Sequence, residues 1–282
     1  LLLHGQVLAS HGAGKEAVTF VGEAPVIIQE RWNIYQLNDI VLNQDFKAYT
    51  TNKTSQKLSN TNTLIGDPSN LFIEEGASIE GVTLNTNEGP IYVGREAEIM
   101  EGSLVRGGLA LCEKASLKLG SKVYGACTVG PHCKVGGEIN NVILHSYSNK
   151  GHDGFLGNSI IGEWCNLGAD TNTSNLKNNY SNVKTYSYID QAEVQTDVQF
   201  MGLCMGDFSK SGINTMFNTA TTVGVSCNVF GSGFPAKYIP SFSWVNTSEI
   251  EDFKLNKAIS AANNMMMRRE LKLSKIDEGI FS

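Results

Sequence analysis

The chain has 282 residues, of which 41% are hydrophobic and 18% are charged, a composition typical of a folded globular protein. Its formal net charge is -6, and no run of Lys or Arg is longer than the pair Arg268-Arg269, which excludes the basic stripe of a nucleic-acid-binding surface. No apolar stretch approaches the roughly 18 residues that a membrane-spanning helix needs. We therefore expect neither nucleic acid nor a membrane among its partners.

The N-terminal segment, residues 1–63, is predicted to be a short mixed α/β region. The chain does not begin with Met, and its opening three leucines are too short for a signal-peptide core, so we expect an upstream portion to be missing. A helix is predicted over residues 29–46, and residues 50–63 are polar and form the expected linker. The apolar face of that helix consists of Trp32, Ile34, Leu37 and Val41.

An aliphatic residue recurs at every sixth position in the middle of the chain. It occurs eight times in succession, at Val93, Ile99, Val105, Leu111, Leu117, Val123, Val129 and Val135. The fourth position after each is mostly small, as at Ala97, Ser103, Ala115, Ser121, Cys127 and Cys133. A period of six is typical of short strands separated by turns around a three-sided coil, with the aliphatic side chains inside. The pattern predicts an all-β fold, a left-handed parallel β-helix of hexapeptide repeats, over residues 64–240.

The same pattern resumes twice further along the chain. It returns at Phe155, Ile161 and Leu167, and again at Met205, Ser211, Phe217, Val223 and Val229. Four of the six cysteines fall on its small position, and no two cysteines form a CxxC pair. We therefore expect reduced, structural thiols in a cytoplasmic protein.

Two intervals interrupt the six-residue period. Val135 to Phe155 is 20 residues and Leu167 to Met205 is 38, and each leaves two residues over after whole hexads. We expect the chain to leave the coil in both intervals, because insertions in repeat proteins gather on one face, which is often the binding face. The second interval includes an Asn-rich stretch, residues 172–197.

The C-terminal tail, residues 241–282, is predicted to be helical. Ser248 followed by Glu251 makes a capping box at the start of a helix. One apolar helix face then consists of Leu255, Ile259, Ala262 and Met266. The basic residues Arg268, Arg269 and Lys272 suit the negative end of a helix dipole, and the alternative is a phosphate clamp.

The first interruption carries the segment SNKGHDGFLGNSIIGEWCNLGADT, residues 148–171. This segment resembles the GlmU-like sugar nucleotidyltransferase/acetyltransferase family, in particular the C-terminal acetyltransferase domain of the bifunctional N-acetylglucosamine-1-phosphate uridyltransferase/glucosamine-1-phosphate acetyltransferase. The match is close over about residues 150–184 and extends over the rest of the β-helix only as a pattern. By this resemblance, residues 1–63 are the remnant of a nucleotidyltransferase-like region.

The resemblance implies an acetyl-CoA-dependent acyltransferase that acts on an amino-sugar phosphate or a nucleotide-linked amino sugar in sugar-nucleotide metabolism. It implies a homotrimer with active sites between subunits, with acetyl-CoA as co-substrate and no tightly bound metal. His152 matches the family's catalytic histidine, and Ala169 matches an alanine that contacts acetyl-CoA. The substrate-binding positions fall on Phe155, Asn166, Asn175 and Lys184. Imidazole suits the role of a base because its ordinary pKa of about 6.5 lies near working pH, and Asp153 beside it is a candidate to orient the ring.

Three other functions can be weighed against the sequence. Phe155 stands where the family has Tyr, and no residue matches the family's phosphate-binding Lys and Arg, so the alternative is a catalytically degenerate β-helix scaffold or ligand-binding trimer. A zinc site of His132, His145 and His152 would have spacings of 13 and 7, which do not fit one column of a coil of three hexads. Nucleotidyl transfer is not expected of this fragment, because residues 11–15 (HGAGK) lack the Thr-Arg that completes the family's phosphate loop.

Overall fold

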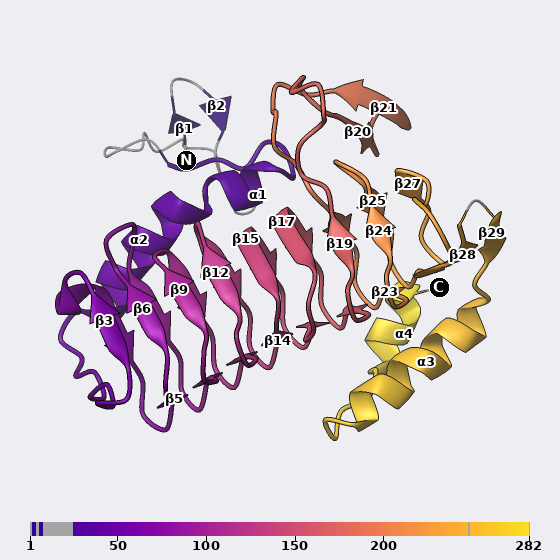
Figure 1. Ribbon diagram of the computed structural model, residues 1–282. Helices are drawn as coiled ribbons and strands as arrows, with labels where there is room; N and C mark the ends of the chain where they lie inside the picture. The colour runs from indigo at the N-terminus through magenta and orange to yellow at the C-terminus, as the bar shows by residue number, and fades with distance from the viewer. Residues whose placement is uncertain (1, 4–5, 8–24, 248, 282) are drawn as a thin grey trace.

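The computed structural model describes residues 2–3, 6–7, 25–247 and 249–281. Short parallel strands stack into a long coil with three faces, which we call faces A, B and C (Figure 1). Residues 11–15 lie outside the described residues. No described helix is both long and apolar enough to cross a membrane.

Each face is a ladder of strands from successive coils. Face A contains β3 (Thr63–Ile65), β6 (Thr83–Asn85), β9 (Leu104–Arg106), β12 (Lys122–Tyr124), the first halves of β15 (Glu138–Leu144) and β17 (Phe155–Ile161), β19 (Asn172–Thr173) and β24 (Met216–Phe217). Face B contains β4 (Leu71–Ile73), β7 (Ile91–Val93), β10 (Leu109–Leu111), β13 (Cys127–Val129), the second halves of β15 and β17, β22 (Cys204–Met205), β25 (Thr222–Val223) and β27 (Tyr238–Ile239). Face C contains β5 (Ser78–Ile79), β8 (Glu98–Ile99), β11 (Ser116–Leu117), β14 (Lys134–Val135), β16 (Asn149–Lys150), β18 (Asn166–Leu167), β23 (Lys210–Ser211), β26 (Asn228–Phe230) and β28 (Ser243–Asn246).

The predicted hexapeptide-repeat β-helix is confirmed by register and burial. Leu111 pairs with Val129 on face B, and Leu117 pairs with Val135 on face C, so the predicted aliphatic positions stack above one another. All four side chains are fully buried in one continuous core. The small positions are buried as well, among them Ala97, Ser103, Ala115, Ser121, Cys127, Cys133, Cys165 and Cys227.

The thiols fit the expected structural role. All six cysteines lie in the described part of the chain and are free, and four of them are buried. Burial raises the pKa of Cys127, Cys133 and Cys165 to about 12. A thiol with so high a pKa stays protonated at neutral pH, so these side chains fill space in the core and do not act as nucleophiles.

The first interruption is a shortened coil, and the prediction that the chain leaves the coil there is wrong. The turn between β14 and β15 has only two residues, Gly136 and Gly137, where the turn between β11 and β12 spans residues 118–121. The corner between faces A and B is the single residue Asn141, in the left-handed region at φ 52°. β16 still pairs with β14, which places Lys150 beside Val135 in the inward column.

The second interruption does leave the coil, as predicted. After β19 the chain forms an arm, residues 176–200, that contains the antiparallel hairpin of β20 (Lys184–Ser187) and β21 (Ala192–Gln195). It then rejoins the coil at β22, which pairs with β17. The arm projects from the edge shared by faces A and B (Figure 1).

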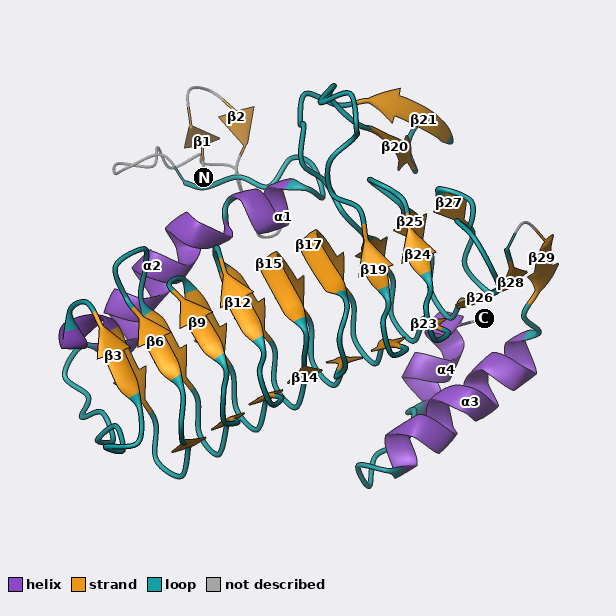
Figure 2. Cartoon of the chain, in the orientation of Figure 1, coloured by secondary structure: helices purple, strands orange, loops and turns teal. Residues whose placement is uncertain are grey.

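The N-terminal helices lie along the same edge (Figure 2). The predicted helix is confirmed over most of its length, as α1 (Asn33–Gln36) and α2 (Asn38–Thr50), preceded by the strands β1 (Leu2–Leu3) and β2 (Gln6–Val7). The Asn38 amide donates to the carbonyl of Ala126 at 2.9 Å and accepts from Thr128 Oγ1 at 2.9 Å, so α2 is hydrogen-bonded to face B.

The C-terminal helices pack near face C. The predicted tail helix is present as α3 (Leu255–Met267), followed by α4 (Lys275–Phe281). The predicted capping box is wrong, because Glu251 lies in β29 (Glu249–Asp252), which pairs antiparallel with β28, and Lys254 precedes the helix instead. Ser248 lies outside the described residues. Phe281 contacts Phe208 edge to face at 5.2 Å, which attaches α4 to the coil.

Candidate functional site

His152 lies on the turn between β16 and β17, at the edge where face C meets face A, and its side chain is exposed. An open cavity of about 700 Å³ adjoins it. Asp153 also lines this cavity, together with Ala169 and Asp170 from the turn one coil further along and Lys118 from an earlier coil. The cavity therefore combines an imidazole, two carboxylates and one ammonium group. No hydrogen bond joins the imidazole of His152 to either carboxylate within the described residues, so the structure does not supply the expected orienting contact.

The backbone of this turn has unsatisfied donors. Within the described residues, the N–H groups of residues 151–154 donate no hydrogen bond, whereas the N–H of Phe155 donates to Asn172 Oδ1 at 2.8 Å. The turn packs tightly on the coil below, since a Cβ added at Gly137 would lie 2.7 Å from the carbonyl oxygen of Gly154. Four consecutive free N–H groups at a partly exposed turn are potential donors to an anion.

Lys150 is a buried residue of this turn that sequence reasoning missed. Its side chain is only 1% exposed and points into the coil from an inward aliphatic position. Its Nζ donates to the carbonyl oxygens of Gly136 at 3.1 Å, His152 at 2.5 Å and Asp153 at 3.0 Å. Burial lowers the pKa of Lys150 to about 8, and the nearby carboxylates of Asp153 and Asp170 limit the decrease. The available signal was its position 15 residues after Val135, which is one shortened coil.

Phe155 and Asn175 both lie against Gly157 of β17. A Cβ added at Gly157 would lie 2.5 Å from the Phe155 ring and 2.8 Å from Asn175 Nδ2, so the ring and the amide both cover this glycine. Asn175 Nδ2 donates to Asn158 Oδ1 at 2.7 Å. Asn158 is itself a left-handed corner residue one coil above Asn141. The Asn175 amide is therefore already engaged in a column of corner asparagines.

Asn166 points from a different face. It lies on β18 in face C, paired in register with Asn149 on one side and Lys210 on the other. Among the described residues, Asn149 Oδ1 is buried and accepts no hydrogen bond. Face C thus presents a row of polar side chains, and within the described residues the amide oxygen of one of them, Asn149, has no donor.

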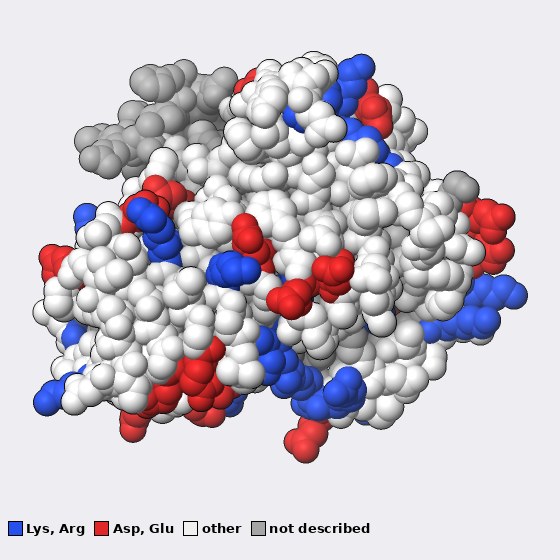
Figure 3. Space-filling view, viewed as in Figure 1, with Lys and Arg blue, Asp and Glu red and all other residues white. Residues whose placement is uncertain are grey.

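Cations gather beside this row. Burial lowers the pKa of Lys134, and the nearby charges of Arg269, Lys118 and Arg268 lower it further. The two arginines directly follow α3. Figure 3 shows Lys and Arg side chains grouped at the lower edge of the coils, where the C-terminal helices meet them. A surface with this grouping attracts anionic groups such as phosphates.

Lys184 lies away from the other predicted site residues. It is exposed on β20 of the arm, and its carbonyl accepts a hydrogen bond from Lys237 Nζ at 2.7 Å. Arg31 connects the hairpin to the coil, because its guanidinium donates to the carbonyl of Tyr186 at 2.6 Å and to Thr222 Oγ1 at 2.9 Å.

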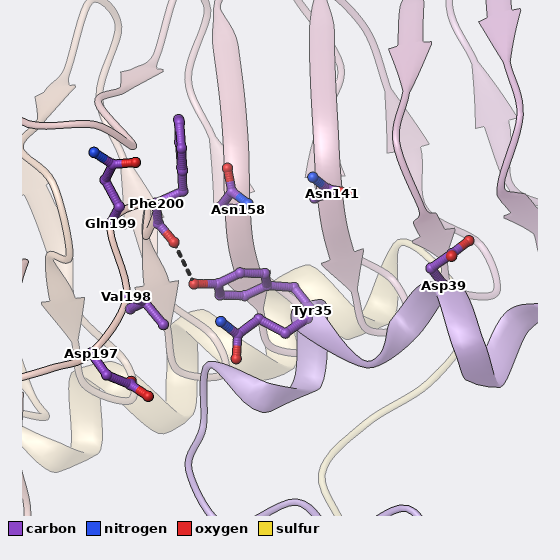
Figure 4. Close-up of a pocket in the computed structure, with 9 residues that line it drawn as sticks. Tyr35, Asp39, Asn141, Asn158, Asp197, Val198, Gln199 and Phe200 are labelled. Atoms are coloured by element: carbon purple, nitrogen blue, oxygen red, sulfur yellow. Dashed lines mark hydrogen bonds between the residues drawn. The ribbon is translucent and has the colours of Figure 1, made fainter. Parts of the chain in front are cut away.

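A second cavity, of about 370 Å³, lies between α1, the corner asparagines and the arm (Figure 4). Tyr35 forms part of its wall and donates from Oη to the carbonyl of Phe200 at 2.7 Å. Its polar lining includes Asn141, Asn158 and Asp197. It contains none of the predicted site residues and joins the site only through the bond between Asn158 and Asn175.

The other histidines named for a zinc site have different surroundings. His132 stacks on Tyr147 at 4.7 Å, and Tyr147 stacks on Trp164 at 4.1 Å, in a column of left-handed residues between faces B and C. Burial lowers the pKa of His132, and Arg269 and Lys114 lower it further. In the portion of the chain that is described, no three His, Cys, Asp or Glu side chains are grouped as metal ligands.

The structure thus divides the predicted site residues among several places. His152 and Ala169 share one cavity. Phe155 and Asn175 both lie against Gly157, while Asn166 and Lys184 lie on face C and on the arm.

Comparison with known proteins adds a family resemblance. No family model matches the chain. The Bifunctional protein GlmU of Methanocaldococcus jannaschii is 32% identical over 108 residues, which cover 38% of this chain and 26% of that protein. The Bifunctional protein GlmU of Synechococcus elongatus is 20% identical over 249 residues, which cover 80% of this chain and 50% of that protein. The chain resembles the GlmU proteins.

The GlmU resemblance predicted from residues 148–171 is therefore confirmed. The chain spans between about a quarter and half of the length of these two GlmU relatives, which is 26% and 50%. Among solved structures, the polySia-specific acetyltransferase NeuO is 11% identical, with 68% of this chain and 82% of that chain covered and a TM-score of 0.35. At this TM-score, the comparison with NeuO does not bear on the function of this chain.

Proposed function

We propose that the chain is an acyltransferase that moves an acetyl group from acetyl-CoA to the amine of an amino-sugar phosphate or a nucleotide-linked amino sugar. The observation that carries this proposal is the cavity shared by His152 and Ala169, on the segment that resembles the GlmU proteins. The exposed imidazole is free to reach a substrate, and free backbone N–H groups lie on the same turn.

The proposed reaction forms a C–N bond and breaks a C–S bond. The amine nitrogen of the acceptor attacks the thioester carbonyl carbon, and His152 takes the proton that the nitrogen loses. Such a base contributes roughly 10²–10⁴-fold to the rate. The carbonyl oxygen becomes negative in the tetrahedral intermediate and is stabilised by donors fixed in the turn. The thiolate of coenzyme A then leaves and accepts a proton from the imidazolium.

The charges around face C support an anionic donor. Lys134, Lys118 and the two arginines that follow α3, Arg268 and Arg269, lie near one another beside the row of Asn149 and Asn166. Coenzyme A carries several phosphates, and Lys and Arg side chains bind such groups through charge-assisted hydrogen bonds. By this proposal the thioester end reaches Ala169, while the phosphates lie toward α3.

A homotrimer is part of the proposal, as in the sequence resemblance. Lys184 is exposed on an arm in the single chain and faces none of the other proposed substrate-binding residues. A neighbouring copy would bring such a group to the cavity of another subunit. Sedimentation of the purified protein tests this state, and a stable monomer that transfers acetyl groups contradicts it.

The function is tested by the release of free thiol from acetyl-CoA in the presence of glucosamine 1-phosphate and a panel of amino-sugar phosphates and nucleotide-linked amino sugars. His152→Ala is expected to lower kcat by about 10²-fold or more with the fold intact. His145→Ala is the matched control, because His145 is also exposed but lies one turn earlier, between faces B and C. Equal activity of the His152 variant and wild type removes this residue from the mechanism.

A ligand-binding scaffold without activity is the second candidate. Asn141, near the position of the family's phosphate-binding Lys, is a corner residue whose Oδ1 accepts from the Ala126 N–H at 3.0 Å. Phe155 also lacks the hydroxyl donor that a Tyr would provide. Binding of acetyl-CoA or an amino-sugar phosphate without thiol release from any acceptor in the panel supports this candidate over the enzyme.

A further inference from the structure

Lys150 occupies a position that most coils give to an aliphatic residue; Ser211 is the other polar residue of this column. In the inward column of face C it follows Ile99, Leu117 and Val135, and Leu167 follows it one coil later. A charged group in such a core is costly unless its hydrogen bonds are satisfied. All three ammonium protons have acceptors here, and each acceptor is a backbone carbonyl of the turns on either side.

Two of those carbonyls belong to the turn that carries His152. In a trans peptide the N–H points opposite to the C=O of the same plane. The carbonyls of His152 and Asp153 point inward to the Lys150 ammonium, so the N–H groups of Asp153 and Gly154 point away from it. Neither of these N–H groups donates a hydrogen bond within the described residues.

We propose that Lys150 is a positioning residue that, from inside the coil, holds the turn 151–154 so that His152 and the N–H of Asp153, which both line the cavity, face it together. The Asp153 N–H is then a donor to the oxyanion of the tetrahedral intermediate. The inference rests on the proposed function only for the identity of that anion. The anchoring of the turn by the ammonium stands on the three contacts alone.

The surrounding coil shows why the turn needs such an anchor. β16 and β18 pair at only one residue, Asn149 with Asn166, whereas β11 and β14 pair at two. The Gly151 N–H is left out of the ladder, and a Cβ added at Gly151 meets no atom within 4 Å. The strand ladder therefore does not fix the start of this turn, and Lys150 supplies the missing contacts from the core side.

The test compares Lys150→Leu with Val135→Ala, a variant of the same inward column one coil below. Lys150→Leu restores the aliphatic pattern, so the midpoint of thermal unfolding is expected to stay within a few degrees of wild type. With the turn released, kcat is expected to fall by at least about tenfold, since removal of one oxyanion donor alone costs roughly 10²–10³-fold. The KM for acetyl-CoA is expected to stay within about twofold. Val135→Ala is expected to lower the midpoint through its cavity and to keep kcat.

Two kinetic results overturn the proposal. One is an unchanged kcat in Lys150→Leu, and the other is an equal loss of kcat in Val135→Ala, which would reduce the effect to general loosening. A crystal structure of Lys150→Leu separates this inference from the proposed function. If wild type transfers no acetyl group, a displaced turn 151–154 in that structure still supports the anchor, and an unchanged turn overturns it.

Discussion

Two neighbouring coils of this protein solve the same packing problem differently. The coil from Leu117 to Val135 keeps the six-residue period, and its interior is aliphatic with small residues at the corners. The coil from Val135 to Lys150 is three residues shorter and places an ammonium group in the same inward column. The inward side chains of Val135 and Lys150 are both fully buried, so the second coil departs from the pattern without opening the core.

The difference shows how a repeat fold acquires a site. In the regular coil, inward hydroxyls such as Ser121 Oγ donate to the nearest turn carbonyl, here that of Lys118 at 2.6 Å. Lys150 makes the same kind of contact with three carbonyls and reaches further along the turn. A longer donor inside the coil thereby reshapes the outer surface above it, where His152 lies.

The largest effect that sharpens this comparison is expected at the two glycines of the turn. Gly154 has φ +112°, and a Cβ there would lie 2.2 Å from the carbonyl oxygen of Thr171. Gly154→Ala is therefore expected to lower the free energy of unfolding by about 3 kcal/mol or more. Gly151→Ala is the matched control, because a Cβ at Gly151 meets nothing within 4 Å, and its effect is expected to stay within about 0.5 kcal/mol. Urea unfolding measures both, and similar values for the two would mean that the turn is not tightly packed.

The regular coils could be predicted from the sequence and the shortened coil could not. The six-residue aliphatic period from Val93 to Val135 is a strong signal because each of its residues fills the same kind of interior position. An interruption of the six-residue period looks the same in the sequence whether the chain leaves the coil or the turn and corner of one coil lose residues. Gly136-Gly137 and Asn141 remove three residues by tight turning, and the hydrophobic pattern does not record backbone conformation.

The site residues show the same limit. Local sequence selected His152 and Ala169, which lie on corresponding turns one coil apart and share a cavity. Lys150 escaped notice because lysine is almost never fully buried, so its place in the aliphatic column was not considered. The supposed capping box failed because Glu251 pairs with Trp244 across two strands, a tertiary contact that overrides the local helix signal.

A second prediction uses the titration of Lys150. Its pKa is about 8 in the folded chain against 10.5 for an ordinary lysine. Between these values the unfolded chain binds more protons, so the free energy of unfolding rises with pH through this window. The full gap corresponds to about 3 kcal/mol, and we expect a gain of roughly 1–3 kcal/mol for wild type relative to Lys150→Leu between pH 7.5 and pH 10.5. Thiols and tyrosines titrate in both proteins, so their contributions cancel when the free energy of unfolding of Lys150→Leu is subtracted from that of wild type. Parallel curves for the two proteins would show that the ammonium is not held in the core.

The smallest expected effect concerns Asn175. Its amide donates to Asn158 in the structure and binds the acceptor substrate in the proposal. Asn175→Ala removes the 2.7 Å bond to Asn158 Oδ1 and is expected to cost about 1 kcal/mol, whereas Ser174→Ala, at the exposed neighbour, is expected to cost less than about 0.5 kcal/mol. If Asn175 also binds the acceptor, the acceptor KM rises severalfold in the first variant and the KM for acetyl-CoA does not. An unchanged acceptor KM would assign this amide to the corner column alone, because the loss of a substrate contact shows in binding while a loss of stability leaves the folded fraction kinetically normal.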